Sequence, residues 1–243
     1  MLEGLYSAAA GMEAQQEQLN AISNDIANVS TSGYKSERVA FSDLLYNPIN
    51  MAGTETTAGA GASAKVIGRS EAQGTLQETG NPLDLAVEGE GYFQVTRANG
   101  QKVLTRDGTF GVDANGAIVN SEGNQLVPPI KLPAGVSAKE VSIAPDGTVT
   151  AGTTKLGQIK LVTVTSPEHL LDDGGGELSV NANSGAVHPA TGKIHQGALE
   201  GSNVNIASAM AQMVTTQRNY QLTSTAIQDE SQMMSIANQL RTP

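Results

Sequence analysis

The sequence predicts an α+β protein in which long N- and C-terminal helices pack as a coiled-coil-like pair, with a central antiparallel β-rich domain between them in the chain. Two observations lead to this fold. Both ends carry apolar residues spaced by seven, which is typical of helices that pack along a seam. In contrast, 23 of the 27 Gly lie between Gly53 and Gly197, where turn dipeptides recur about every eight residues.

The N-terminal segment, residues 1–47, is predicted to form a helix that ends in an extended turn. Its seam consists of Leu5, Met12, Leu19 and Ile26, and a smaller and more polar companion row consists of Leu2, Ala9, Gln16 and Ser23. Three hydroxyl residues followed by Gly33 indicate the end of the helix, because glycine readily adopts a positive φ.

Residues 48–72 form a Gly-, Ala- and Thr-rich insertion between the helix and the β-rich domain. Small side chains without periodicity are typical of a flexible linker, or of a loop that is ordered only by its contacts. We therefore expect no regular structure in this insertion.

The β-rich domain is predicted over residues 73–200. Dipeptides that favour turns lie at Asn99–Gly100, Asp107–Gly108, Asn115–Gly116, Glu122–Gly123 and Asp146–Gly147. The runs between them are short and partly alternating, which predicts a meander of hairpins. The later run Leu156–Thr165 is predicted to be one strand, either with a bulge or buried on both faces.

The C-terminal segment, residues 201–243, is predicted to be one helix of roughly 40 residues, because no Gly or Pro lies between Ser202 and Thr242. Ser202 and Asn203 are good N-cap residues for it. Its seam consists of Ile206, Met213, Tyr220, Ile227 and Met234, with a mostly polar companion row of Met210, Gln217, Ser224, Ser231 and Asn238. Helices with a half-polar seam are marginal alone, so the two ends should need other copies or other chains to become ordered.

Composition excludes several classes of protein. The 243 residues include 14 Lys and Arg against 24 Asp and Glu, and a net charge of −10 would repel phosphate backbones, so no nucleic acid is expected as partner. The absence of Cys excludes disulfide bonds and thiolate metal sites. The first residues lack the features of a cleaved secretory signal peptide, and no window approaches about 18 apolar residues, so no membrane insertion is expected.

Residues that could carry chemistry do not form a recognisable constellation. His169, His188 and His195 have no metal-ligand spacing and no neighbouring nucleophile. The segments Asp113–Gly116 and Asp172–Gly176 resemble fragments of calcium loops but lack a full ligand set, so they are read as solvated turns. We therefore predict no catalytic residue, no metal site, no cofactor and no enzymatic activity.

Four blocks of local sequence carry the most specific signal. They are Asn24–Lys35 (NDIANVSTSGYK), Gly74–Leu76 with Thr79–Phe93 (TGNPLDLAVEGEGYF), Thr105–Phe110 (TRDGTF) and Gln196–Asn205 (QGALEGSNVN). In order and spacing these blocks resemble the flagellar rod and hook proteins, the axial proteins of the bacterial flagellum. Asn24 and Asn28 lie on one helical face, where their amides can reach a neighbour without the cost of burying a charge.

This resemblance implies a structural subunit of the flagellar basal-body rod. Many copies would polymerise through their terminal helices into a hollow axial tube that transmits torque and passes exported protein. The expected partners are further copies of the chain, neighbouring rod and hook proteins, and the flagellar type III export apparatus, which would export the chain without a cleaved signal peptide. The predicted assembly interface consists of Leu5, Met12, Leu19, Asn24, Ile26, Asn28, Gly33, Ser202, Asn203, Ile206, Met213, Tyr220, Ile227 and Met234.

Several alternatives remain open at this level. The single β-rich domain resembles rod proteins more than the hook protein, and the insertion with the Ser202–Asn205 block favours the distal rod over a proximal rod paralogue. A second hypothesis is a secreted adhesin or ligand-binding β-module with a coiled-coil stalk. That module would form a small closed oligomer, whereas a rod subunit would assemble into an open helical polymer.

Overall fold

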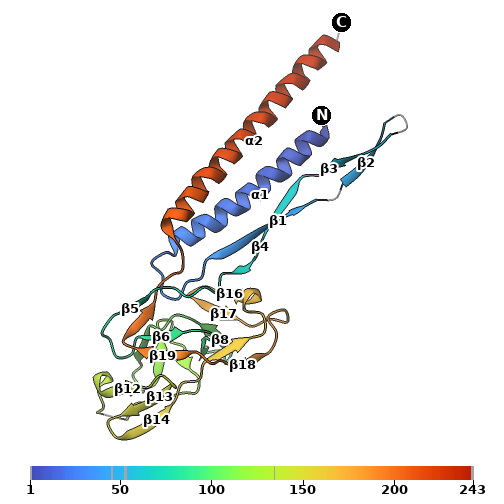
Figure 1. Ribbon diagram of the computed structural model, residues 1–243. Coiled ribbons are helices and arrows are strands. Elements are labelled where there is room, and N and C mark those ends of the chain that lie inside the picture. The colour runs from blue at the N-terminus through green and yellow to red at the C-terminus, as the bar shows by residue number, and fades with distance from the viewer. Residues whose placement is uncertain (1, 45, 52–53, 134, 242–243) are drawn as a thin grey trace. The chain divides into compact units, whose positions relative to one another are not determined.

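The computed structural model describes residues 2–44, 46–51, 54–133 and 135–241 (Figure 1). Within these residues the chain divides into two compact units. Unit 1 comprises residues 1–27, 37–67 and 205–243, and unit 2 comprises residues 28–36 and 68–204. The β-rich unit therefore includes the segment that follows the first helix and the segment that precedes the last, which the expected boundaries at 73 and 200 left outside it.

Unit 1 contains both long helices, α1 (Leu2–Ala27) and α2 (Ile206–Arg241). They lie side by side in Figure 1, blue and red. The 36 residues of α2 correspond to about 54 Å of helix. Among the described residues no helix is long and apolar enough to span a membrane. An α+β fold is confirmed, whereas a coiled-coil geometry for the helix pair stays a prediction.

The first strands of unit 1 correct the expectation of an irregular insertion. They are β1 (Glu37–Asp43), β2 (Tyr46–Met51), β3 (Thr54–Gly59) and β4 (Ala62–Arg69), whose last two residues belong to unit 2. β1 pairs with β4, and β2 pairs with β3 from Tyr46 opposite Gly59 to Met51 opposite Thr54. The small residues of this ribbon hide its strand character, which its threonines favour.

Unit 2 consists of short strands joined by turns. They are β5 (Leu76–Glu78), β6 (Leu85–Glu88), β7 (Phe93–Thr96), β8 (Lys102–Thr105), β9 (Phe110–Val112), β10 (Ile118–Asn120), β11 (Gln125–Leu126), β12 (Val141–Ile143), β13 (Thr148–Ala151), β14 (Thr154–Gln158), β15 (Val162–Val164), β16 (Leu171–Asp172), β17 (Glu177–Ser179), β18 (Val187–Pro189), β19 (Lys193–Gln196) and β20 (Ala198–Glu200). Two single-turn 3₁₀ helices lie at Ala138–Glu140 and Pro167–His169.

The strands of unit 2 pair only in the antiparallel sense among the described residues. The largest sheet has the order β16-β17-β8-β7-β11-β10-β9, and β12-β13-β14 form a second sheet. Two-stranded pairs join β15 to β18, β19 to β6 and β20 to β5. The last two pairs bring the final strands of unit 2 back to strands that begin more than a hundred residues earlier.

Two local predictions in this unit are wrong. Asp107–Gly108 is not a hairpin turn, because β8 and β9 lie apart in the sheet and Gly108 instead packs against the Leu85 carbonyl. The run 156–165 is not one strand, because it is interrupted between β14 and β15 where Ile159 and Leu161 turn into the core. The hairpins at Asn99–Gly100, Asn115–Gly116, Glu122–Gly123 and Asp146–Gly147 are confirmed.

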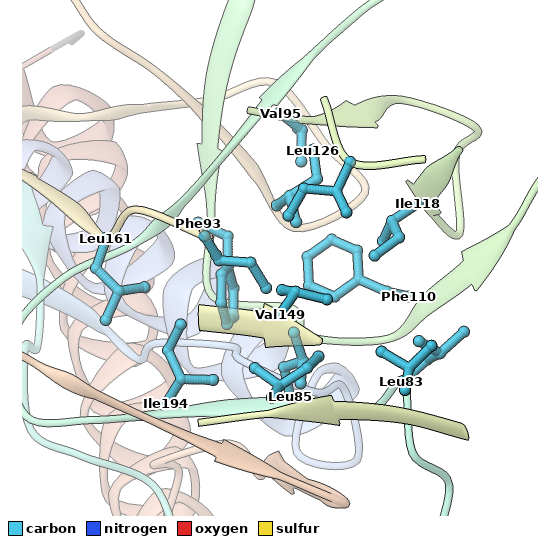
Figure 2. Close-up of a cluster of buried hydrophobic side chains, with 14 of the residues drawn as sticks. Leu83, Leu85, Phe93, Val95, Phe110, Ile118, Leu126, Val149, Leu161 and Ile194 are labelled. Atoms are coloured by element: carbon cyan, nitrogen blue, oxygen red, sulfur yellow. The ribbon is translucent and has the colours of Figure 1, made fainter. Parts of the chain in front are cut away.

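A large cluster of buried side chains forms the main core of unit 2 (Figure 2), and a smaller one surrounds Tyr92 and Leu104. Phe93 and Phe110 lie at its centre with ring centroids 5.2 Å apart and planes at 88°, the edge-to-face arrangement that aromatic pairs prefer. Around them Val95, Leu126 and Ile194 are also fully buried. Because Ile194 comes from β19, the core is complete only when the C-terminal strands are in place.

Candidate assembly interface

The two helices of unit 1 run antiparallel to each other. The Thr216 hydroxyl donates to the Gln18 side-chain oxygen at 3.3 Å, and a Cβ placed on Gly4 would lie 3.4 Å from the Glu230 carboxylate. The residue numbers of both pairs add up to 234, so position n of α1 lies level with about position 234−n of α2.

The contact strip of α2 combines a predicted row with an unpredicted one. Of the predicted row, Met213, Tyr220, Ile227 and Met234 are half-buried, whereas Ile206 is exposed. Their companions are the row that begins with Ala209 and Thr216, both buried, and continues through two half-buried residues, Thr223 and Glu230. The predicted companion row is wrong by one position, because small residues allow the two backbones to approach and the longer Met210 and Gln217 point away.

The contact strip of α1 is centred on residues that the sequence argument passed over. Ala14, Ala21 and Ile22 are its buried side chains. The predicted row of Leu5, Met12, Leu19 and Ile26 is half-buried at the flank of this strip. The predicted companion residues Ala9, Gln16 and Ser23 are exposed, because other faces of α1 pack against α2 and β1.

Large apolar side chains remain exposed on α2. Leu222 is 69% exposed, Met233 59% and Met210 52%, and Val214, Ile206 and Ile236 are about half exposed. Met210, Val214 and Leu222 lie off the strip that faces α1, whereas Ile206, Met233 and Ile236 lie towards the two ends of α2. A helix with apolar residues on several sides is usually covered on several sides, so α2 presents surface that one chain does not bury.

The N-cap of α2 differs from the prediction. Asn205, and not the Ser202–Asn203 pair, caps the helix: its side-chain oxygen accepts from Ser208 N at 3.0 Å and its carbonyl from Ala209 N at 2.9 Å. The Asn203 amide serves unit 2, where it donates to the Ser70 and Ala72 carbonyls and accepts from Ser36 N.

The two asparagines near the end of α1 have local roles. Asn24 is exposed and donates to Glu37 Oε1 at 3.0 Å, and the Asn28 side chain accepts from the Thr31 hydroxyl at 3.2 Å. Asn24 belongs to unit 1 and Asn28 to unit 2. An intermolecular role for either residue stays a prediction.

Gly33 has both a positive φ, 70°, and no space for a side chain. A Cβ there would lie 2.5 Å from the backbone carbon of Arg106, a distance that real Cβ atoms do not show. Its N–H donates to the Glu200 carbonyl at 2.7 Å. The predicted break after α1 is therefore confirmed, and it is built into unit 2.

A buried charge cluster, which we call the Glu200 cluster (Lys35, Arg106 and Glu200), lies beside this break. Lys35 Nζ contacts Glu200 Oε1 at 2.7 Å, and an Arg106 Nη contacts Glu200 Oε2 at 3.0 Å. The side chains are 3%, 5% and 0% exposed. Its members lie within three of the four family-like blocks, but they could not be predicted to meet, because charged residues are almost never this buried without pairing.

Tyr92 and the backbone extend this cluster. Arg106 stacks over the Tyr92 ring at 5.1 Å, and the Tyr92 hydroxyl donates to Glu71 at 2.7 Å. Burial, reinforced by Glu71, raises the pKa of Tyr92 above its usual range. Burial lowers the pKa of Lys35, against the opposing effect of Glu200.

The other polar side chains singled out in the sequence have ordinary partners. Asp113 Oδ1 accepts from the Asn115 and Ala117 amides in its own turn, and Asp173 pairs with Arg97. His195 contacts Glu88 at 2.7 Å on the surface, which holds the pKa of that carboxyl below its usual value. Among the described residues no group of three or more His, Asp or Glu is arranged to hold a metal ion.

Comparison with known proteins identifies the family. Three family profiles match in chain order: the flagella basal body rod protein profile over residues 5–35, the flagellar hook protein FlgE/F/G D1 domain over 86–151, and the flagellar basal body rod FlgEFG protein C-terminal profile over 195–240.

Full-length relatives agree with the profiles. The flagellar basal-body rod protein FlgG of Borreliella burgdorferi is 35% identical over 263 aligned residues, covering 99% of each chain. The FlgG proteins of Agrobacterium fabrum and Bacillus subtilis are 34% and 32% identical, covering 98% and 96% of this chain and 98% and 97% of their own. The chain therefore belongs to the flagellar basal-body rod and hook family, and it is a structural protein of the flagellar basal body.

Proposed function

We propose that the chain is a subunit of the distal part of the rod, which polymerises through α1 and α2 into a hollow axial tube. The relatives' FlgG names support the rod assignment, and the expected neighbours are further copies and other rod and hook proteins of the same family. Passage of the unfolded chain through the flagellar export apparatus is part of the same proposal. A structural role, and not catalysis, is what the relatives' names indicate.

The observation that carries the proposal is the uncovered apolar surface of α2. Among the α2 residues whose burial is described, six large apolar side chains are between 45% and 69% exposed. Burying the exposed half of one such side chain contributes about 1 kcal/mol. Six of them, repeated in every copy, supply enough apolar surface for neighbouring helices to associate. All six belong to α2, so this association does not involve the core of unit 2.

The test compares two adjacent residues of α2 in the full-length chain. Leu222→Glu places a charge at the most exposed of these apolar positions, whereas Gln221→Glu makes the same change of charge at an exposed polar position next to it. We expect Leu222→Glu to abolish polymerisation in sedimentation assays and motility in cells, with Gln221→Glu close to wild type. Normal assembly of the Leu222→Glu chain would refute the role of this surface.

A further inference from the structure

The Glu200 cluster joins parts of the chain that are far apart in sequence. Lys35 follows α1, Arg106 follows β8, and Glu200 ends β20. One carboxylate serves both cations and also accepts from Gly74 N at 2.9 Å. A charge this deeply buried is tolerated only with its partners in place, so none of the three side chains can reach its native environment alone.

We propose that the Glu200 cluster makes the closure of unit 2 conditional on residues 198–203, so that the β-rich unit and both segments leading to the helices become ordered in one step. This inference concerns the folding of a single chain and does not rest on the proposed assembly.

The main chain around the cluster supports this dependence. Gly33 N donates to the Glu200 carbonyl at 2.7 Å, and Asn203 N donates to the Tyr34 carbonyl at 3.3 Å. The Asn203 side chain accepts from Ser36 N at 2.8 Å. The segment that leaves α1 is therefore bound directly to the segment that enters α2, and each lacks these partners until the other arrives.

The Glu200 cluster contains one carboxylate for two cations, so it has no spare negative charge. Lys35 and Arg106 share the Glu200 carboxylate, whereas Glu71 bonds to the Tyr92 hydroxyl and acts on Lys35 only as the weakest of its electrostatic neighbours. Arg106 Nε is buried without a hydrogen-bond partner among the described residues. Without Glu200, two like charges would be enclosed with no direct counter-ion, which favours an open unit 2 over a closed one.

The order of the three residues in the chain determines when unit 2 can close. Lys35 and Arg106 precede Glu200 by 165 and 94 positions. A chain that emerges with its N-terminus first therefore cannot complete unit 2 until Glu200 has also emerged and can dock. Before Glu200 docks, closing unit 2 would bury Lys35 and Arg106 without their counter-ion, which is unfavourable.

Hydrogen exchange on the full-length chain tests the proposal. Glu200→Gln removes the shared charge, and Glu78→Gln is the matched control, because Glu78 is exposed on the strand that pairs with β20. We expect Glu200→Gln to raise the opening constant of amides in β7 and β8, and of residues 28–36, by about a hundredfold or more. Glu78→Gln should leave both unchanged. Faster exchange confined to residues 72–74 and 198–203 in the Glu200→Gln chain would overturn the proposal.

A double-mutant cycle separates charge from shape. Lys35→Met alone should have a small effect, since Glu200 keeps Arg106 and Gly74 as partners. Added to Glu200→Gln, it removes an unpaired buried charge and should recover at least about tenfold of the lost protection. Additive effects would show that Glu200 acts by packing alone. If Glu200→Gln does not fold, a folded double variant still confirms the electrostatic dependence, and a double variant that is also unfolded overturns it.

Discussion

Gly33 and Gly80 offer a matched pair for measuring how much the close approach at Gly33 contributes to stability. Both have a positive φ, 70° and 72°, and both donate their N–H to a carbonyl near the end of unit 2, at 2.7 Å to Glu200 and 3.2 Å to Gly197. They differ in their surroundings, because a Cβ on Gly80 meets nothing within 4 Å and one on Gly33 meets the Arg106–Asp107 peptide at 2.5–2.7 Å.

The expected cost of alanine follows from these surroundings. Gly80→Ala pays only the left-handed strain, about 1–2 kcal/mol. Gly33→Ala adds a collision with backbone that cannot rotate away, about 1–3 kcal/mol for overpacking, and weakens a hydrogen bond that contributes about 1 kcal/mol. We therefore expect Gly33→Ala to lower the free energy of unfolding of unit 2 by about 2–4 kcal/mol more than Gly80→Ala does.

The assay is hydrogen exchange of the β7 and β8 amides in the full-length chain, which reports the opening free energy of unit 2 separately from the helices. The comparison cancels the backbone preference of glycine in the unfolded chain, since both variants lose one glycine. Equal destabilisation of the two variants would refute the argument that contact with Arg106, and not the positive φ, makes glycine necessary at position 33.

Two other predictions concern the chemistry of Tyr92 and the independence of the ribbon. The raised pKa of Tyr92 stabilises the folded state fully below the ordinary tyrosine pKa of about 10, and this stabilisation is lost as the pH rises above it. The free energy of unfolding of wild type should thus fall more steeply than that of Tyr92→Phe between about pH 9 and 11, and parallel slopes in denaturant titrations would contradict this. Replacing residues 46–59 by a short turn should leave the melting temperature of unit 2 unchanged. In the part of the chain that the structure describes, β2 and β3 pair only with each other, and Leu44 N already donates to Gly61 O across the base of the ribbon. A lower melting temperature would show that the ribbon supports unit 2.

The sequence predicted those features that depend on local patterns. The long helices follow from the absence of Gly and Pro in residues 203–241 and from the seven-residue spacing of Met213, Tyr220 and Ile227. Hairpins such as β7–β8 follow from dipeptides that need positive φ, and Gly100 has it. In these cases neighbours in sequence settle the conformation.

The missed features depend on contacts between distant residues. Nothing near Gly108 in sequence reveals that the Leu85 carbonyl occupies the place where a side chain at position 108 would lie. Likewise, the charges of Lys35 and Arg106 indicate exposed residues until Glu200 is brought between them. The companion row of α2 was misplaced for a related reason, because Ala209 is buried by the approach of another helix and not by its own hydrophobicity.

The register between the helices leaves α2 longer than its partner. Residues whose numbers add to 234 lie level, so Leu2 of α1 lies opposite about position 232, while α2 continues to Arg241. The overhang of nine residues is about 13 Å long. Met233 and Ile236, both at least half exposed, lie on it. Any neighbour that covers these two side chains has to reach past the N-terminal end of α1, at a level where the first helix of the same chain offers no cover.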